Sequence, residues 1–185
     1  MTNLEQDPVI NVITRGIRRD IDVLLAEKSL RGALVLLYSA IDTMAALAIP
    51  AGQISVTRTD FIAWADTYVR FPCQEQVTGK ELYSARCAVL HTYSSDSDMT
   101  RAGACRRLGY MSKAVPEVAY NAKVDKDLVL VAVPGLRDAV FAGIDRFLVD
   151  AYADRTRAPL LEGRLKALLH ELPLSAPTDG STAAT

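Results

Sequence analysis

Apolar residues recur at intervals of three and four along most of the chain, the spacing that gathers them on one face of an α-helix. The first such run follows Asp7-Pro8, a pair suited to the N-cap and first position of a helix, and extends to about Glu27. Ser29 suits the N-cap of a second helix, which extends to about Ala48 and is apolar on nearly every side. Such a helix is expected at the centre of a bundle or in an oligomer interface.

Four more helices are predicted, at residues 61–69, 80–93, 134–155 and 160–170. Thr59 or Asp60 is expected to cap the first of these four. In the segments 105–113 and 128–133, apolar residues instead alternate with polar ones or form a continuous run that includes β-branched residues. This pattern favours two short strands. The pattern therefore predicts a mainly α fold with a small β-hairpin after the fourth helix of the chain.

The length of the chain suits one domain. A chain of 185 residues can bury a sizeable core, and no internal repeat divides it. We expect one helical domain over residues 1–172. The remaining residues, 173–185, are rich in Pro, Ser, Thr and Ala, a composition typical of a disordered tail.

The charge of the chain is nearly balanced. Its net charge is −1, so the chain as a whole is not drawn to nucleic acid or to an anionic membrane. Two arginine pairs, Arg18-Arg19 and Arg106-Arg107, stand out locally. An arginine fork suits a phosphate and a carboxylate equally well, so the sequence leaves open whether either pair lines a basic groove.

The cysteines and the N-terminus favour a cytoplasmic protein. Cys73, Cys87 and Cys105 are odd in number and lack CxxC spacing, so neither a metal site nor a disulfide framework is expected, and we expect no cofactor. The start of the chain lacks the basic and apolar regions of a signal peptide. Charged residues interrupt every long apolar run, so no membrane association is predicted.

The segment ELYSARCAVLHTY, residues 81–93, is the place where side chains suited to catalysis converge. On an ideal helix Arg86 and Tyr93 lie on one stripe, whereas His91 is turned by about 140° from Arg86. Arg86 and His91 are therefore not expected to pair on one face of the helix. They can still flank a cleft whose other wall comes from a second subunit.

Arginine and histidine together are sufficient for metal-independent cleavage of RNA. An imidazole can take the proton of the ribose 2′-hydroxyl, because it titrates near neutrality. A guanidinium stabilises the negative charge that develops on the phosphoryl oxygens. RNA supplies its own nucleophile, so this chemistry requires neither a metal ion nor a cofactor.

Asp42 is the exceptional residue of the apolar second helix. A carboxylate in such a helix needs a partner or must lie at the rim of the core. It either supports a site near Arg86 or forms a salt bridge at the edge of the core. In a purely structural interpretation, a buried Arg86 pairs with Asp42 or Asp66, and His91 is satisfied at a helix end.

The run RCAVLHTY, residues 86–93, resembles the signature of the HEPN superfamily, in which an arginine, four to six further residues and a histidine lie on a helix of an α-bundle. The resemblance implies an antiparallel helical bundle in which Arg86 and His91 are catalytic. Tyr93 would be an auxiliary residue, and in the toxins paired with minimal nucleotidyltransferase antitoxins it would be the target of modification. Cys87 stands where that family usually has a polar residue.

The same resemblance implies partners. Family members are typically homodimers whose facing motifs form a composite ribonuclease site, and the toxin group has an antitoxin partner protein. The alternative from the residues alone is a non-catalytic helical interaction module, or a nucleotide-binding module in which Arg86 holds a phosphate. A serine or cysteine hydrolase is not expected, because no G-x-S-x-G elbow is present.

Overall fold

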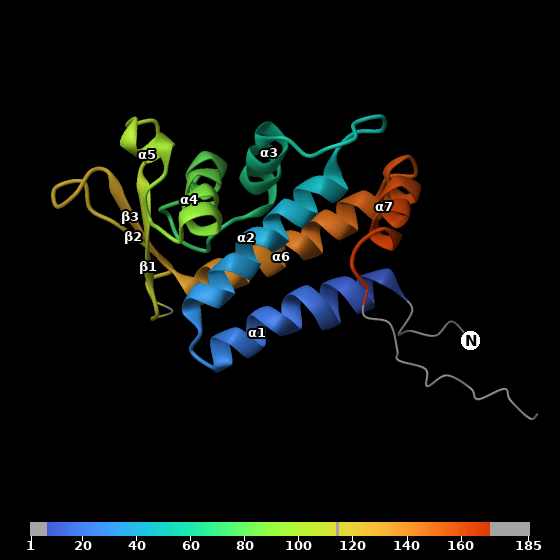
Figure 1. The fold of residues 1–185 in the computed structure, drawn as a ribbon, viewed down its shortest axis with the longest axis horizontal. Helices are drawn as coiled ribbons and strands as arrows, with labels where there is room; N and C mark the ends of the chain where they lie inside the picture. Colours follow the sequence, from blue (N-terminus) through green and yellow to red (C-terminus); the bar gives the residue numbers. More distant parts are fainter. Residues whose placement is uncertain (1–6, 114, 171–185) are drawn as a thin grey trace, which may run out of the picture.

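Two long helices, α2 (Leu30–Ala48) and α6 (Val133–Ala153), lie against each other through the middle of the molecule (Figure 1). The computed structural model describes residues 7–113 and 115–170. The side chains Leu37, Ile41 and Met44 of α2 are fully buried. The apolar pattern of α2 thus reflects a central position in a mainly helical fold.

By length and composition alone α2 could also cross a membrane, but 50% of its most apolar stretch is buried inside the molecule. A core helix explains the same composition.

The N-terminal helix occupies the predicted segment, but its first part is not the α-helix that the spacing of apolar residues predicts. A π-helical stretch, η2 (Val9–Arg18), continues directly into α1 (Arg19–Ala26). The carboxylate of Asp7 accepts hydrogen bonds from the backbone N–H groups of Val9 at 2.9 Å and Ile10 at 3.1 Å. The predicted cap is therefore confirmed, since Asp7 satisfies donors that the first turn leaves free.

Capping boxes fix the starts of the next two helices, α3 (Arg58–Tyr68) and α4 (Gly79–Thr92). Thr57 caps α3 and Asp60 completes the box from its first turn, so the expectation that Thr59 or Asp60 itself is the cap is wrong. Thr78 and Glu81 form the same box at α4. Such an end is stabilised by two hydrogen bonds: the side-chain oxygen of the cap residue accepts from the third helical N–H, and the carboxylate at that third position accepts from the N–H of the cap residue.

The segment after α4 forms a three-stranded sheet. A short helix, α5 (Asp98–Arg101), precedes β1 (Arg107–Met111), β2 (Val118–Tyr120) and β3 (Leu128–Ala132). The strand order is β1-β3-β2, with β3 parallel to β1 and antiparallel to β2.

The expected hairpin between segments 105–113 and 128–133 is therefore wrong in its pairing, although both segments contain strands. The loop between them carries β2, and it takes the chain to the far side of β3 before β3 begins. A parallel pair requires a long crossover of this kind. β3 takes the central place because it is the most apolar strand, with Val129 and Val131 fully buried.

The C-terminal helices close the bundle. α6 begins at Val133, one residue before the predicted Pro134-Gly135, and packs on α2 and α3. α7 (Arg157–Lys166) begins three residues before the predicted helix and ends four residues earlier. It is attached to the end of α2 by Arg164, which donates to the carbonyl oxygens of Leu47 at 2.9 Å and Pro50 at 3.0 Å. The predicted disordered tail, 173–185, lies outside the described residues.

Candidate functional site

Asp42 and Arg86 meet where α4 packs on α2. The Nε atom of Arg86 donates to Oδ2 of Asp42 at 2.8 Å, and both side chains are about one quarter exposed, at 23% and 27%. The carboxylate of Asp42, which is exceptional in the apolar second helix, thus has an arginine partner at the rim of the core. This contact agrees with both interpretations of Asp42, as a support for Arg86 and as a structural salt bridge.

His91 is in contact with the same guanidinium. The Nη1 atom of Arg86 lies 3.2 Å from Nε2 of His91, and the histidine is exposed at the surface. The expectation that the two residues cannot pair within one helix is wrong. It considered only the directions of the Cα–Cβ bonds, whereas the long arginine side chain spans the angle between them.

This contact defines the role of one nitrogen of the histidine. A guanidinium only donates hydrogen bonds, so Nε2 of His91 accepts with its lone pair in this contact. The tautomer that makes this hydrogen bond carries its proton on Nδ1. A neutral imidazole beside a cation is the form that can act as a general base.

The electrostatic surroundings keep Arg86 charged. Burial acts to lower the pKa of its guanidinium, but the hydrogen bond and charge of Asp42, with a smaller contribution from Cys87, raise that pKa overall. Cys87 also interacts with Tyr83, whose pKa is raised by burial first and by Cys87 second. The guanidinium of Arg58 lies 5.5 Å from the centre of the Tyr83 ring. Sequence reasoning missed Arg58 and Tyr83, because they share no motif with Arg86.

Tyr93 does not share the stripe of Arg86. α4 ends at Thr92, and Tyr93 caps it in the left-handed conformation, with a φ of 53°. The N–H of Ser94 then donates to the carbonyl oxygen of Ala88 at 3.1 Å. The helical stripe predicted to extend to residue 93 therefore ends one residue early, and 65% of Tyr93 is exposed.

A small cavity lies beside Tyr93, where the start of α2, the end of α4 and β1 meet. Its volume is about 190 Å³. Its lining is Arg31 and Leu34 of α2, Val89 of α4, Tyr93 with the two serines after it, and Tyr110 of β1. We call this cavity the Tyr93 pocket. No motif in the sequence pointed to it, because its walls come from segments far apart in the chain.

The wall on the sheet side is fixed by a pair of tyrosines. The hydroxyl oxygens of Tyr38 and Tyr110 lie 2.6 Å apart. Burial is the main cause that raises the pKa of both hydroxyl groups, so both stay protonated. The paired hydroxyls connect α2 to β1 and give the Tyr93 pocket a rigid side.

Exchange of Tyr93 for glycine is expected to raise the free energy of unfolding by about 0.5–1 kcal/mol, because the left-handed conformation penalises a side chain and glycine adopts it freely. Urea denaturation measures the change. Thr92→Gly, one residue earlier and inside the helix, is the matched control and should destabilise the protein by about 1 kcal/mol. If Tyr93→Gly also lowered the free energy of unfolding, packing of the tyrosine ring would stabilise the fold, and the prediction would be wrong.

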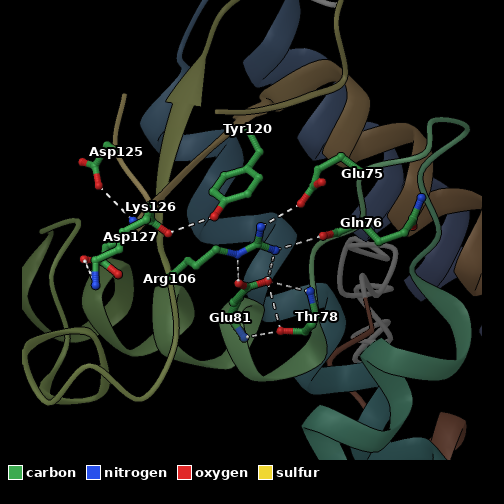
Figure 2. A network of polar contacts seen from close by, with 9 residues as sticks. All are labelled: Glu75, Gln76, Thr78, Glu81, Arg106, Tyr120, Asp125, Lys126 and Asp127. Carbon is green, nitrogen blue, oxygen red and sulfur yellow. Dashed lines mark hydrogen bonds and ion pairs between the residues drawn. The ribbon is translucent and has the colours of Figure 1, made fainter. Parts of the chain in front are cut away.

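A second cluster, around Arg106, connects α4 to β1 (Figure 2). Arg106 donates through Nε to Oε1 of Glu81 at 2.5 Å and through Nη1 to Oε1 of Glu75 at 2.7 Å. Its Nη2 donates to the carbonyl oxygen of Gln76 at 3.2 Å. The ring of Tyr120 lies over the guanidinium, 4.6 Å from ring centre to Cζ. The hydrogen bond to Glu81 is the main cause that raises the pKa of Arg106.

Three of the four arginines in the two pairs lie near carboxylates. Arg106 is engaged by Glu75 and Glu81, and Arg107 lies 3.8 Å from Asp96. Arg18 likewise donates to Asp145 at 2.5 Å. Arg18 and Arg106 therefore have a structural role as partners of carboxylates.

The described part of the chain comprises residues 7–113 and 115–170. Within those ranges no group of three His, Cys, Asp or Glu side chains could hold a metal ion. The three cysteines are free and half-buried.

The arrangement around Arg86 can hold an oxyanion and move a proton. The guanidinium has several N–H donors, and Asp42 and His91 engage only part of them. A phosphate oxygen at this edge would meet a fixed positive charge beside an imidazole. No protein-family model, curated protein or solved structure matches the chain.

Proposed function

We propose that the chain is a HEPN-like, metal-independent endoribonuclease in which Arg86 and His91 perform the chemistry. The observation that carries this proposal is the contact of 3.2 Å between the guanidinium and an exposed imidazole, with Asp42 bound to Arg86 at 2.8 Å. A charged group for an oxyanion and a proton acceptor thus lie next to each other at the surface. The RCAVLHTY motif supports the same assignment through its resemblance to the HEPN superfamily.

The reaction needs two proton transfers. When an RNA phosphate binds, its oxygens compete for the donors of Arg86, which frees the Nε2 lone pair of His91. Nε2 then takes the proton of the 2′-hydroxyl, and the 2′-oxygen forms a bond to phosphorus. The bond from phosphorus to the 5′-oxygen breaks, and this oxygen takes up a proton. The products are a 2′,3′-cyclic phosphate and a 5′-hydroxyl.

A homodimer would supply both proton-transfer groups at once. The chain has two histidines, and the second, His170, is engaged with the carbonyl oxygen of Leu165 at 3.0 Å. One copy therefore offers one imidazole at the site, whereas two facing copies offer two, one as the base and the other, once protonated, as the acid that donates to the 5′-oxygen. As in the proteins that the motif resembles, we propose a toxin or defence effector with an antitoxin partner protein.

The Asp42–Arg86 ion pair also supports a second candidate. A salt bridge at the rim of a core can be purely structural, and a helical module of this kind could bind a partner protein or a nucleotide without catalysis. Cleavage separates the two candidates, because only the ribonuclease changes its RNA.

The test uses a purified sample in EDTA with single-stranded RNA and with the same sequence fully 2′-O-methylated. We expect cleavage of the RNA alone, with 2′,3′-cyclic phosphate ends identified by mass spectrometry. An intact RNA at high protein concentration would refute the ribonuclease, as would equal cleavage of both strands. Light scattering of the same sample tests the dimer, and a strict monomer that cleaves RNA would remove only the two-fold part of the proposal.

A further inference from the structure

The Tyr93 pocket has the size and lining of a site for one flat ring system. Pockets for drug-sized ligands hold about 300–1,000 Å³, whereas this one holds about 190 Å³. Leu34 and Val89 supply an apolar surface, and Ser94, Ser95 and Tyr110 supply groups that form hydrogen bonds. A nucleobase has this combination of a flat apolar face and a polar edge.

Tyr93 is placed to stack on such a ring. The residue is 65% exposed and lines the pocket, so its side chain is accessible to a ligand there. It also adopts a left-handed backbone conformation, in which glycine would be less strained than a bulky residue. An aromatic side chain at that position is unfavourable for stability. Stacking on a bound base would explain why the position is nonetheless a tyrosine.

Arg31 adds a positive charge at the edge of the pocket. The side chain is exposed, and no ion-pair partner is found for it among the residues that the structure describes. Arg18, Arg106 and Arg137 differ, since each pairs with a carboxylate. Arg31 is thus free to meet a phosphate that follows the base.

The pocket and the Arg86 cluster lie along the same two helices. Leu34 and Asp42 are eight residues apart on α2, which corresponds to about 12 Å along the helix axis. Val89 of the pocket follows Arg86 by one turn of α4. One single strand of RNA can therefore reach both places.

We propose that the Tyr93 pocket binds one unpaired base of the RNA strand held at Arg86, with Tyr93 stacking on the base and Arg31 contacting the adjacent phosphate. The inference rests on the proposed ribonuclease function and adds to it a site for substrate recognition. Because stacking accepts any base face, the site would favour single-stranded RNA over duplex RNA.

Binding is measured by fluorescence anisotropy with a labelled, fully 2′-O-methylated octanucleotide, which cannot be cleaved. Tyr93→Ala should weaken binding roughly 5- to 150-fold, the range of base–aromatic stacking, and Tyr93→Phe should bind like the natural protein. Arg31→Ala should reduce the slope of log K against log salt by about 0.7, the value for one phosphate contact on a single strand. Tyr152→Ala and Arg155→Ala, exposed residues outside the pocket, are the matched controls and should change neither quantity.

Cleavage of unmodified RNA by the same variants separates this inference from the function on which it rests. If the natural protein cleaves RNA but Tyr93→Ala and Arg31→Ala bind and cleave like it, the pocket proposal is refuted and the ribonuclease stands. If the octanucleotide binds with the expected dependence on both residues but no RNA is cleaved, the pocket stands and the ribonuclease is refuted. Absence of binding refutes the pocket. Circular dichroism of each variant confirms that a loss of binding is not a loss of fold.

Discussion

Exchange of His91 for alanine is expected to lower the rate of RNA cleavage by about 10²–10⁴-fold, the usual contribution of a positioned general base. The reason is that Nε2 of His91 is the proton acceptor beside the guanidinium of Arg86. Single-turnover cleavage in EDTA measures the chemical step. His170→Ala is the matched control, since that imidazole contacts the carbonyl oxygen of Leu165 and not Arg86, and its rate should not change.

Arg86→Ala is expected to lower the same rate by about 10²–10³-fold, because the charge on the phosphoryl oxygens loses a fixed donor. Arg86→Lys should restore little, since an ammonium group lacks the planar fork that reaches Asp42 and His91 together. Asp42→Asn should have a smaller effect, about tenfold, because Asp42 positions Arg86 and does not touch the substrate. Equal rates in the natural protein and in the Arg86 and His91 variants would assign the activity to a contaminant.

The largest expected loss of stability follows removal of Arg106. Arg106→Ala should lower the free energy of unfolding by about 3 kcal/mol, because it leaves the carboxylate of Glu81 buried without its cation. Glu81 has only 5% of its side chain exposed, and Arg106 also binds Glu75 and the backbone of Gln76. Denaturation in urea measures the change.

The neighbouring arginine provides the control for this loss. Arg107 lies 3.8 Å from Asp96 and 4.0 Å from Asp125, and 38% of its side chain is exposed. Arg107→Ala should therefore cost less than about 1 kcal/mol. A double exchange of Arg106 and Glu81 for methionine should recover much of the loss, since apolar residues of similar volume avoid the desolvation of two charges. Equal effects at Arg106 and Arg107 would contradict the role of the buried carboxylate.

The helices could be predicted from the chain because each depends on neighbouring residues. Spacings of three and four placed the helices, and Asp7 was recognised as a cap because a cap bonds to N–H groups two and three residues away. The end of α4 was less certain. Tyr93 takes a left-handed conformation that the residue type disfavours, so the pattern predicted one helical residue too many.

The pairing of the strands depended on the tertiary structure. The apolar segments around β1 and β3 were recognised, but their parallel pairing requires β2 to lie on the far side of β3. The sequence predicted a hairpin because the two segments follow each other along the chain. Burial of the apolar strand β3 between two neighbours decided otherwise.

The sequence by itself determined a mainly helical chain with an apolar central helix and one helical segment that contains both Arg86 and His91. Only the tertiary structure decided that Asp42, forty-four residues earlier, holds Arg86, and that Tyr93 faces a separate pocket with Arg31. The reason is physical. Periodicity reports which face of a helix is buried, whereas a contact between two helices depends on how they pack and on where long side chains reach.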